Sequence, residues 1–306
     1  MSILLSGDFN ANQKSELRFV SKNTILSHYG SQLYEQIKYH IMLGDTGFGR
    51  PGNYKSDKEA YKSLAHRPFP ILSVIGDDDP LFYSGKYDEV DIGIGETVYQ
   101  INDTPFIAYL KKGKIYYIEG IKFLVLGGAK AFQHNSKNKT TQFNEEKAYW
   151  SEKEKKDLFM LLENDNKFDF VLSHTGPSNI NYYFFNSKKN NKIDIYDEVS
   201  KLNSLIKEKI HYWEWICGHF RMEAHCLSKY EEHESYDNKG FEYLYRRTLM
   251  LNKINDAIRQ YYVDQKDIKI ILRGPHAKHG GIPEYKKRVL LEWDFFHQPS
   301  PPPGFW

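Results

Sequence analysis

Five short apolar runs in this sequence each end on carboxylate or histidine side chains. A short apolar run that stops at glycine or polar residues predicts a buried β-strand. In open α/β sheets, ligands gather at the carboxyl ends of such strands. Aspartate and histidine at strand ends are typical ligands of divalent metals. The five polar ends are Ser6-Gly7-Asp8-Phe9-Asn10, Gly44-Asp45, Gly76-Asp77-Asp78-Asp79, Ser173-His174 and Gly218-His219-Phe220-Arg221.

This ordered set resembles the calcineurin-like metallophosphoesterase family. That family carries Asp-x-His, Gly-Asp, Gly-Asn-His-(Asp/Glu), a lone His and Gly-His-x-His, and the resemblance covers residues 1–250 in the same order. Each motif alone is weak, but five in order, each after an expected strand, form a specific signal. The resemblance implies a two-sheet α/β sandwich over residues 1–250, with the motifs at one edge. Residues 251–306 are expected to form a small helix and hairpin extension with a proline-rich tail.

The sequence departs from the family pattern at four positions. Asn10 stands where the family has a metal-binding His, and Asp77 stands where it has Asn. Asp78 replaces the His that assists the leaving group, and Arg221 replaces the last metal-binding His. Asp78 can act as an acid only if neighbouring carboxylates raise its pKa, which a nearby Arg221 would oppose. The metal centre is therefore expected to be a modified one.

The resemblance implies two metal positions, and only one of them keeps a full set of ligands. The residues at the first position are Asp8, Asn10, Asp45 and Arg221. An Arg side chain has no lone pair to donate, and Asn offers only a neutral carbonyl oxygen, so this position should be weak or empty. The second position has competent ligands throughout, and one Mn, Fe or Zn ion is expected there. Its ligands are Asp45, Asp77, His174 and His219.

Two classes of function follow from this site. In the first, the protein is a metal-dependent phosphoesterase that hydrolyses a phosphomonoester or phosphodiester. Asn10 and Arg221 would contact phosphate oxygens, and Arg221 would act as a charge clamp in place of the missing metal. In the second, the protein is a catalytically inactive scaffold. Arg221 would then bind the carboxylates of Asp8 and Asp78 in a buried ion network, and residues 251–306 could provide a surface for a protein partner.

Composition narrows these classes only slightly. With 306 residues, 40% of them hydrophobic, the chain can form one large domain or two small ones. A formal net charge of +2 gives little support to a nuclease, although nucleic acid stays open as a substrate. The two cysteines, Cys217 and Cys226, imply no disulfide framework and are expected on adjacent strands. The sequence shows no signal peptide and no membrane span, so a cytoplasmic protein is expected.

The apolar periodicity also predicts the order of elements along the chain. Residues 106–126 are expected to form a meander that begins the second sheet, while residues 80–96 and 178–191 are expected to be loops. The expected helices are 12–29, 55–65, 145–164, 193–210 and 251–262. The expected strands are 3–5, 38–43, 69–75, 106–110, 114–118, 122–126, 168–173, 213–217, 224–230, 241–248, 268–272 and 289–293.

Overall fold

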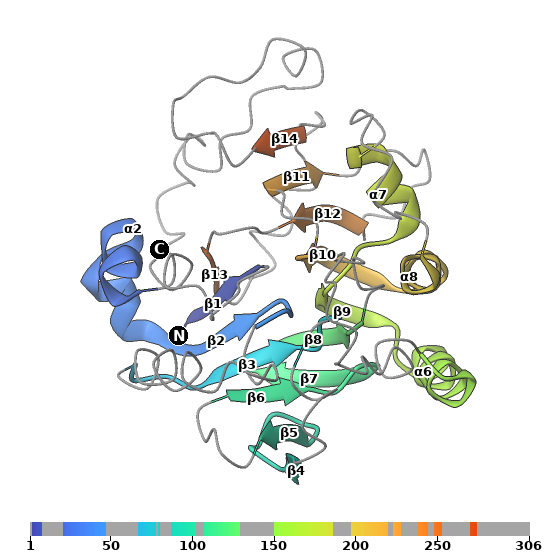
Figure 1. The fold of residues 1–306 in the computed structure, drawn as a ribbon, viewed down its shortest axis with the longest axis horizontal. Coiled ribbons are helices and arrows are strands. Elements are labelled where there is room, and N and C mark those ends of the chain that lie inside the picture. The colour runs from blue at the N-terminus through green and yellow to red at the C-terminus, as the bar shows by residue number, and fades with distance from the viewer. Residues whose placement is uncertain are drawn as a thin grey trace, which may run out of the picture.

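Two mixed β-sheets and a small number of helices make up the computed structural model (Figure 1). This is the α/β class that the sequence predicts, and it is consistent with a two-sheet sandwich. The described residues are 2–7, 21–46, 67–77, 79, 87–101, 107–128, 150–185 and 197–219, together with the backbone of strands at 223–227, 238–243, 248–252 and 270–273.

The first sheet contains the strands that precede the first three motifs. Strands β1, β2, β3 and β6 run parallel to one another, while β13 pairs antiparallel with β1 and the β4–β5 hairpin pairs antiparallel with β6. The parallel strands end at the same edge, so their motifs lie together. In spatial order the seven strands are β13 (Thr248–Asn252), β1 (Ser2–Ser6), β2 (Ile37–Met42), β3 (Ile71–Val74), β6 (Ile107–Leu110), β5 (Val98–Ile101) and β4 (Tyr87–Val90).

The second sheet contains the strands that precede the two histidine motifs. Strands β8, β9, β10 and β12 are parallel, and β7, β11 and β14 are antiparallel to their neighbours. In spatial order the seven strands are β14 (Ile270–Arg273), β11 (Glu223–Leu227), β12 (Asn238–Tyr243), β10 (His211–Cys217), β9 (Lys167–Ser173), β8 (Ile121–Leu126) and β7 (Lys114–Ile118).

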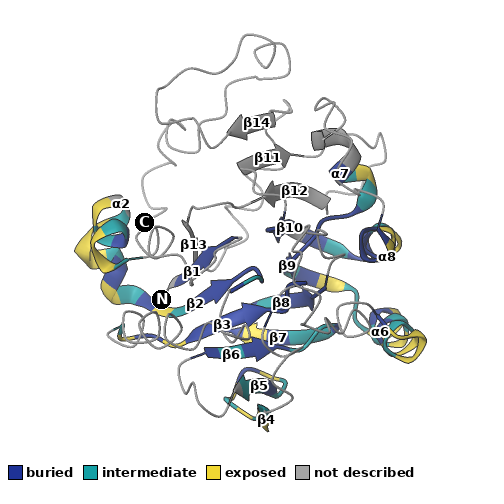
Figure 2. Ribbon diagram, viewed as in Figure 1, coloured by how far each residue is buried: buried dark blue, intermediate teal, exposed yellow. Residues whose placement is uncertain are grey.

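The main hydrophobic core lies between the two sheets. Ile3 and Leu5 of β1 belong to the same buried cluster as Phe170 and Leu172 of β9, whereas Leu4 belongs to a separate cluster with residues of helix α2 (Lys22–Gln36). This division follows the alternation of side chains along a strand. Burying each such side chain contributes about 1.5–3 kcal/mol. Figure 2 shows many buried residues in β1–β3 and β8–β10, a group that includes the five strands that lead to the motifs.

Helix α2 (Lys22–Gln36) covers the outer face of the first sheet. Its side chains Ile25 and Tyr34 pack with Leu4 of β1 and Phe69. Ser21 caps its N-terminus, and Gly30 interrupts its helical geometry with φ 78° and ψ 169°. The break at Gly30 agrees with the expected end of the helix at residue 29, and a further helical segment that the sequence analysis did not predict follows it to Gln36.

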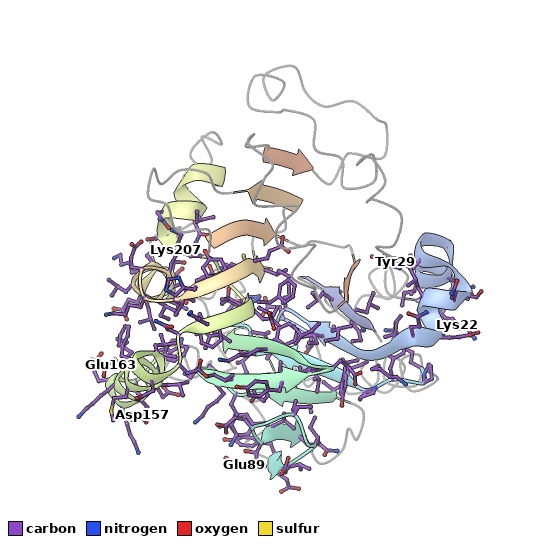
Figure 3. The ribbon with its side chains drawn as sticks, turned by 180° about the vertical axis from the view of Figure 1, so that it is seen from behind. Lys22, Tyr29, Glu89, Asp157, Glu163 and Lys207 are labelled. Carbon is purple, nitrogen blue, oxygen red and sulfur yellow. The ribbon has the colours of Figure 1, made fainter. Side chains whose placement is uncertain are left out.

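The outer face of the second sheet is covered by α6 (Glu152–Asn164) and α8 (Glu198–Lys207). Leu158 and Leu162 of α6 face the sheet and pack in the cluster that contains Trp215. Figure 3 shows Asp157 and Glu163 on the opposite, outer side of the same helix. Helix α7 (Ser178–Phe185) lies next to α8. None of the helices in the described part of the chain is long and apolar enough to cross a membrane.

The expected meander over residues 106–126 is wrong in its first strand. Strand β6 pairs with β3 and β5 in the first sheet, and only β7 and β8 form a hairpin in the second. The chain passes from one sheet to the other at a turn that includes Gly113, which has φ 71°. A tight glycine turn suits such a crossing as well as a hairpin, so the turn residues alone did not distinguish them.

Other sequence expectations also need correction. The loop expected at 80–96 contains strand β4, and the loop expected at 178–191 begins with helix α7. The strand expected at 241–248 is two strands, with β12 in the second sheet and β13 in the first. Cys217 and Cys226 do not lie on adjacent strands, because β12 lies between β10 and β11. The expected helix 251–262 is wrong at its start, because residues 251 and 252 belong to β13. The rest of that helix, and the expected elements at 55–65 and 289–293, lie outside the described residues.

Candidate metal centre

Four side chains that the sequence predicts as ligands come together where the two sheets meet. Asp45 and Asp77 follow β2 and β3 of the first sheet, and His174 and His219 follow β9 and β10 of the second. One ligand atom from each lies within 4.8 Å of all the others. Asp77, His174 and His219 are buried, and Asp45 is partly exposed. The group could hold a metal ion, because two carboxylates and two imidazoles are a common ligand set for divalent ions.

Two glycines let the loops that carry these ligands approach one another. A Cβ atom at Gly44, which has φ +90°, would lie 2.4 Å from Nδ1 of His174. A Cβ atom at Gly76 would lie 2.4 Å from both the backbone nitrogen and Oδ1 of Asp45. Glycine is therefore sterically required before the Asp of each Gly-Asp pair, because any side chain at that position would displace a candidate ligand.

The hydrogen bonds of His174 define which ring nitrogen faces the site. Nδ1 lies 2.7 Å from the carbonyl oxygen of Leu43, and because a carbonyl oxygen only accepts, Nδ1 carries a hydrogen. Nε2 faces the other ligands, 2.9 Å from Oδ1 of Asp77 and 3.5 Å from Oδ2 of Asp45. A metal-binding histidine commonly donates its other N–H to a carbonyl or carboxylate, which fixes the orientation of the ring. His174 is oriented in this way, with Nε2 as the candidate ligand atom.

His219 presents Nδ1 to the same group. This atom lies 3.1 Å from Nε2 of His174 and 3.4 Å from Oδ1 of Asp77. The backbone N–H of Gly218 donates to the carbonyl oxygen of His174 at 3.0 Å, which joins the two histidine loops. His219 has φ 73° and Asp45 has φ 52°, so both have left-handed backbones that are uncommon for residues other than glycine. Such strain of about 1–3 kcal/mol per residue is found most often at functional sites.

The carboxylates and imidazoles of the group shift one another's pKa values. Burial alone would lower the pKa of His174, but the Asp45 and Asp77 carboxylates raise it well above its ordinary value. Burial alone would raise the pKa of Asp77, but hydrogen bonds from His174 and His219, and their charge, lower it well below its ordinary range. Without a metal, a proton on His174 therefore balances the carboxylates. A divalent cation would take the place of that proton.

Asp79 is a buried acidic residue to which the sequence analysis assigns no role. Burial and the neighbouring Asp45 raise its pKa to about 6, while hydrogen bonds from Gly76 and Thr46 act in the opposite direction. The run of three carboxylates in Gly76-Asp77-Asp78-Asp79 indicates from sequence that Asp79 lies near the site, but it does not indicate the role of Asp79. A buried carboxylate that binds no metal needs hydrogen-bond donors, and the neighbouring loop backbone supplies them.

The remaining predicted site residues, Asp8, Asn10, Asp78 and Arg221, lie outside the described residues. The strand that leads to the first motif does reach the site. The backbone N–H of Leu43 donates to the carbonyl oxygen of Ser6 at 2.8 Å, and the carbonyl oxygen of Leu43 accepts from His174. The end of β1 is therefore connected through one residue to a candidate ligand.

Comparison of the sequence with known proteins identifies no relative. No protein-family model matches the sequence, and a search of curated proteins finds no match either. Support for a function therefore comes from the geometry of the candidate metal centre and from the order of the motifs.

Proposed function

We propose that the protein is a metal-dependent phosphoesterase of the calcineurin-like kind, with a modified metal centre, that hydrolyses a phosphomonoester or a phosphodiester. The observation that carries the proposal is the cluster of Asp45, Asp77, His174 and His219. The first sheet contributes its carboxylates and the second its imidazoles, each at the end of a strand. The order of the motifs along the chain supports the same family, and the two sheets with outer helices suit its sandwich fold.

The ligand set favours a single Mn, Fe or Zn ion. Imidazole nitrogen suits these metals, whereas Mg and Ca prefer oxygen ligands alone. Asp45 and Asp77 supply the negative charge, and His174 and His219 supply nitrogen through Nε2 and Nδ1. The first metal position of the family, which falls on Asp8, Asn10, Asp45 and Arg221, would need Asn10 and Arg221 as ligands, so we propose one tightly bound ion at the second position.

The protein's own residues would prepare the site for hydrolysis. A divalent ion supplies Lewis-acid polarisation of a phosphoryl oxygen and activation of water. Leu43 holds the His174 ring through its carbonyl oxygen. Asp45 is the partly exposed member of the group, so substrate would approach from its side. We assign contact with phosphate oxygens to Asn10 and Arg221, with Arg221 as a fixed positive charge. Asp78 takes the place of the family's acid for the leaving group, and it could donate a proton only if the neighbouring carboxylates raise its pKa against the effect of Arg221.

Hydrolysis of chromogenic phosphomonoesters and phosphodiesters, after chelation and reloading with Mn, Fe or Zn, tests this proposal. We expect activity that depends on metal and falls at least about 100-fold in His174→Ala, because a ligand is lost. His211→Ala is the matched control, since His211 lies at the opposite end of β10 from the His219 loop and should keep the parent activity. Activity without metal, or an active His174→Ala variant, would contradict the proposal.

A scaffold function is the alternative, and the departures at Asn10, Asp78 and Arg221 favour it. Each of them replaces a histidine that the family uses for metal binding or catalysis. In this case residues 251–306 would contribute to a surface for a protein partner. The metal-loaded protein would then hydrolyse neither class of ester, nor single-stranded or double-stranded oligonucleotides, and that result would select the scaffold.

A further inference from the structure

Asp79 is a fully buried carboxylate between the two ligand loops of the first sheet. Its Oδ2 accepts hydrogen bonds from the backbone N–H groups of Asp45, at 3.1 Å, and Gly76, at 2.6 Å. Its Oδ1 accepts from the backbone N–H of Thr46, at 2.9 Å, and from the Thr46 hydroxyl, at 2.8 Å. One carboxylate therefore binds the loop after β2 and the loop after β3 at the same time.

These contacts show that Asp79 differs in role from the candidate ligands. Each of its oxygens already accepts two hydrogen bonds, which is the usual capacity of a carboxylate oxygen. The group whose ligand atoms lie within 4.8 Å of one another contains Asp45 and Asp77 but not Asp79. Asp79 thus contacts the backbone that carries the ligands and not the place where a metal would bind.

The donors belong to the residues that set the ligand positions. Asp45 has φ 52°, and the N–H groups on both sides of its Cα, those of Asp45 and Thr46, point to Asp79. Gly76 directly precedes Asp77. The Thr46 hydroxyl also lies 2.9 Å from the Tyr109 hydroxyl of β6, and because it donates its one hydrogen to Asp79, Tyr109 donates to it. The chain of contacts therefore extends from the loops to a third strand of the sheet.

We propose that Asp79 is a positioning residue that sets the geometry of the metal centre by holding the Asp45 and Asp77 loops together. This role rests on the proposed function, since it requires that Asp45 and Asp77 bind metal. Loss of the Asp79 carboxylate would leave both ligands present but would release the backbone that aligns them.

Titration of the metal-free full-length protein with Co²⁺, followed by visible absorption, tests this role. Asp79→Asn keeps the size of the side chain but turns an amide N–H₂ toward backbone donors. We expect its Kd for Co²⁺ to rise about 10- to 100-fold, the usual effect of losing a group that orients ligands, with a changed Co²⁺ spectrum. Thr46→Val removes only the hydroxyl donor and should raise the Kd less. Thr46→Ser keeps a hydroxyl and should have the parent Kd.

Asp197→Asn is the matched control. Asp197 is also buried and accepts hydrogen bonds from Val199 and Ser200, but it caps α8 and none of its donors belongs to the ligand loops. It should lower thermal stability and leave the Kd for Co²⁺ unchanged. If Asp79→Asn, like Asp197→Asn, leaves the Kd for Co²⁺ unchanged, or if Thr46→Val binds Co²⁺ as tightly as Thr46→Ser, the positioning role is wrong. The proposed metal centre itself would not be contradicted by that result. If the parent protein binds no Co²⁺, both the positioning role of Asp79 and the proposed metal centre are wrong.

Discussion

At the scale of single residues, the candidate centre depends on backbone geometry as much as on ligand chemistry. Gly44 and Gly76 allow the loops to approach, while Asp45 and His219 keep left-handed backbones. The motifs predict the four candidate ligands from sequence, because Asp and His at strand ends have a recognisable pattern. They do not predict Asp79, whose role depends on where the backbone N–H groups of a distant loop point.

Substituting Gly44 by Ala tests the close approach of the loops. The new Cβ would lie 2.4 Å from Nδ1 of His174, so we expect a loss of about 2–4 kcal/mol in the free energy of unfolding, combining strain with overpacking. Gly93→Ala is the control: Gly93 has φ +78° but no atom within 4 Å of its Cβ position, and should cost only about 1 kcal/mol. Urea denaturation measures both, and equal losses would show that the contact with His174 is unimportant.

The stability of the metal-free protein should carry a pH signature of the Asp77–His174 pair. The raised pKa of His174 adds stability that is fully present below its unfolded value of about 6.5 and is lost as pH rises through the folded pKa. The lowered pKa of Asp77 adds stability that is present above its unfolded value of about 3.9 and is lost as pH falls through the folded pKa. The contribution of the pair is therefore largest between about pH 4 and 6.5.

Urea denaturation in chelator, at pH 4 to 9, measures this contribution as the difference between the parent and His174→Gln. The difference is needed because burial and Arg67 lower the pKa of His40, whose contribution changes with pH in the opposite direction. With metal bound, the difference in the free energy of unfolding between parent and variant should instead increase as pH rises. Metal binding requires a neutral His174 and therefore strengthens with pH. A parent-minus-variant difference that grows from pH 6.5 to 9 in chelator would contradict the proposed ion pair.

At the scale of elements, the sequence predicts the buried parallel strands well and their partners poorly. Strands β2, β3, β9 and β10 are recognisable as apolar runs that end on polar motifs, but apolar runs do not encode which sheet they join. Strand β6 lies in the first sheet and β7 in the second, on either side of a three-residue connection. Strand β13 likewise returns from the second sheet to pair with β1. Such pairings depend on contacts between residues far apart in the sequence.

Strand β13 offers a test of this arrangement. It pairs along all of β1, from Ser2 opposite Asn252 to Ser6 opposite Thr248, and β1 leads to the first motif. A chain that ends after residue 247 should lose its cooperative unfolding transition, because the backbone of β1 would lose its hydrogen bonds on one side. A chain that ends after residue 255 keeps β13 and is the control, since both lack β14. Thermal unfolding followed by circular dichroism compares them, and equal transitions would show that β13 is dispensable.

At the scale of the whole molecule, the candidate centre belongs to neither sheet alone. The first sheet supplies two carboxylates and the second supplies two imidazoles, so the ligands assemble only when the sheets pack on their common core. The order of the motifs allowed this convergence to be predicted, because parallel strands present their carboxyl ends at one edge. The sequence did not predict the tilt of the histidine rings or the His219 backbone, which follow from packing between sheets.

Metal stoichiometry is the most direct test of the account. The purified protein would be stripped with chelator, titrated with Mn²⁺ and Zn²⁺, and analysed for bound metal after gel filtration. We predict one tightly bound equivalent per chain, lost in both Asp77→Ala and His219→Ala. Asp169→Ala, a carboxylate that accepts the backbone N–H of Lys122 away from the site, should retain it. No bound metal, two tightly bound equivalents, or an equivalent that survives the loss of Asp77 and His219 would contradict the account.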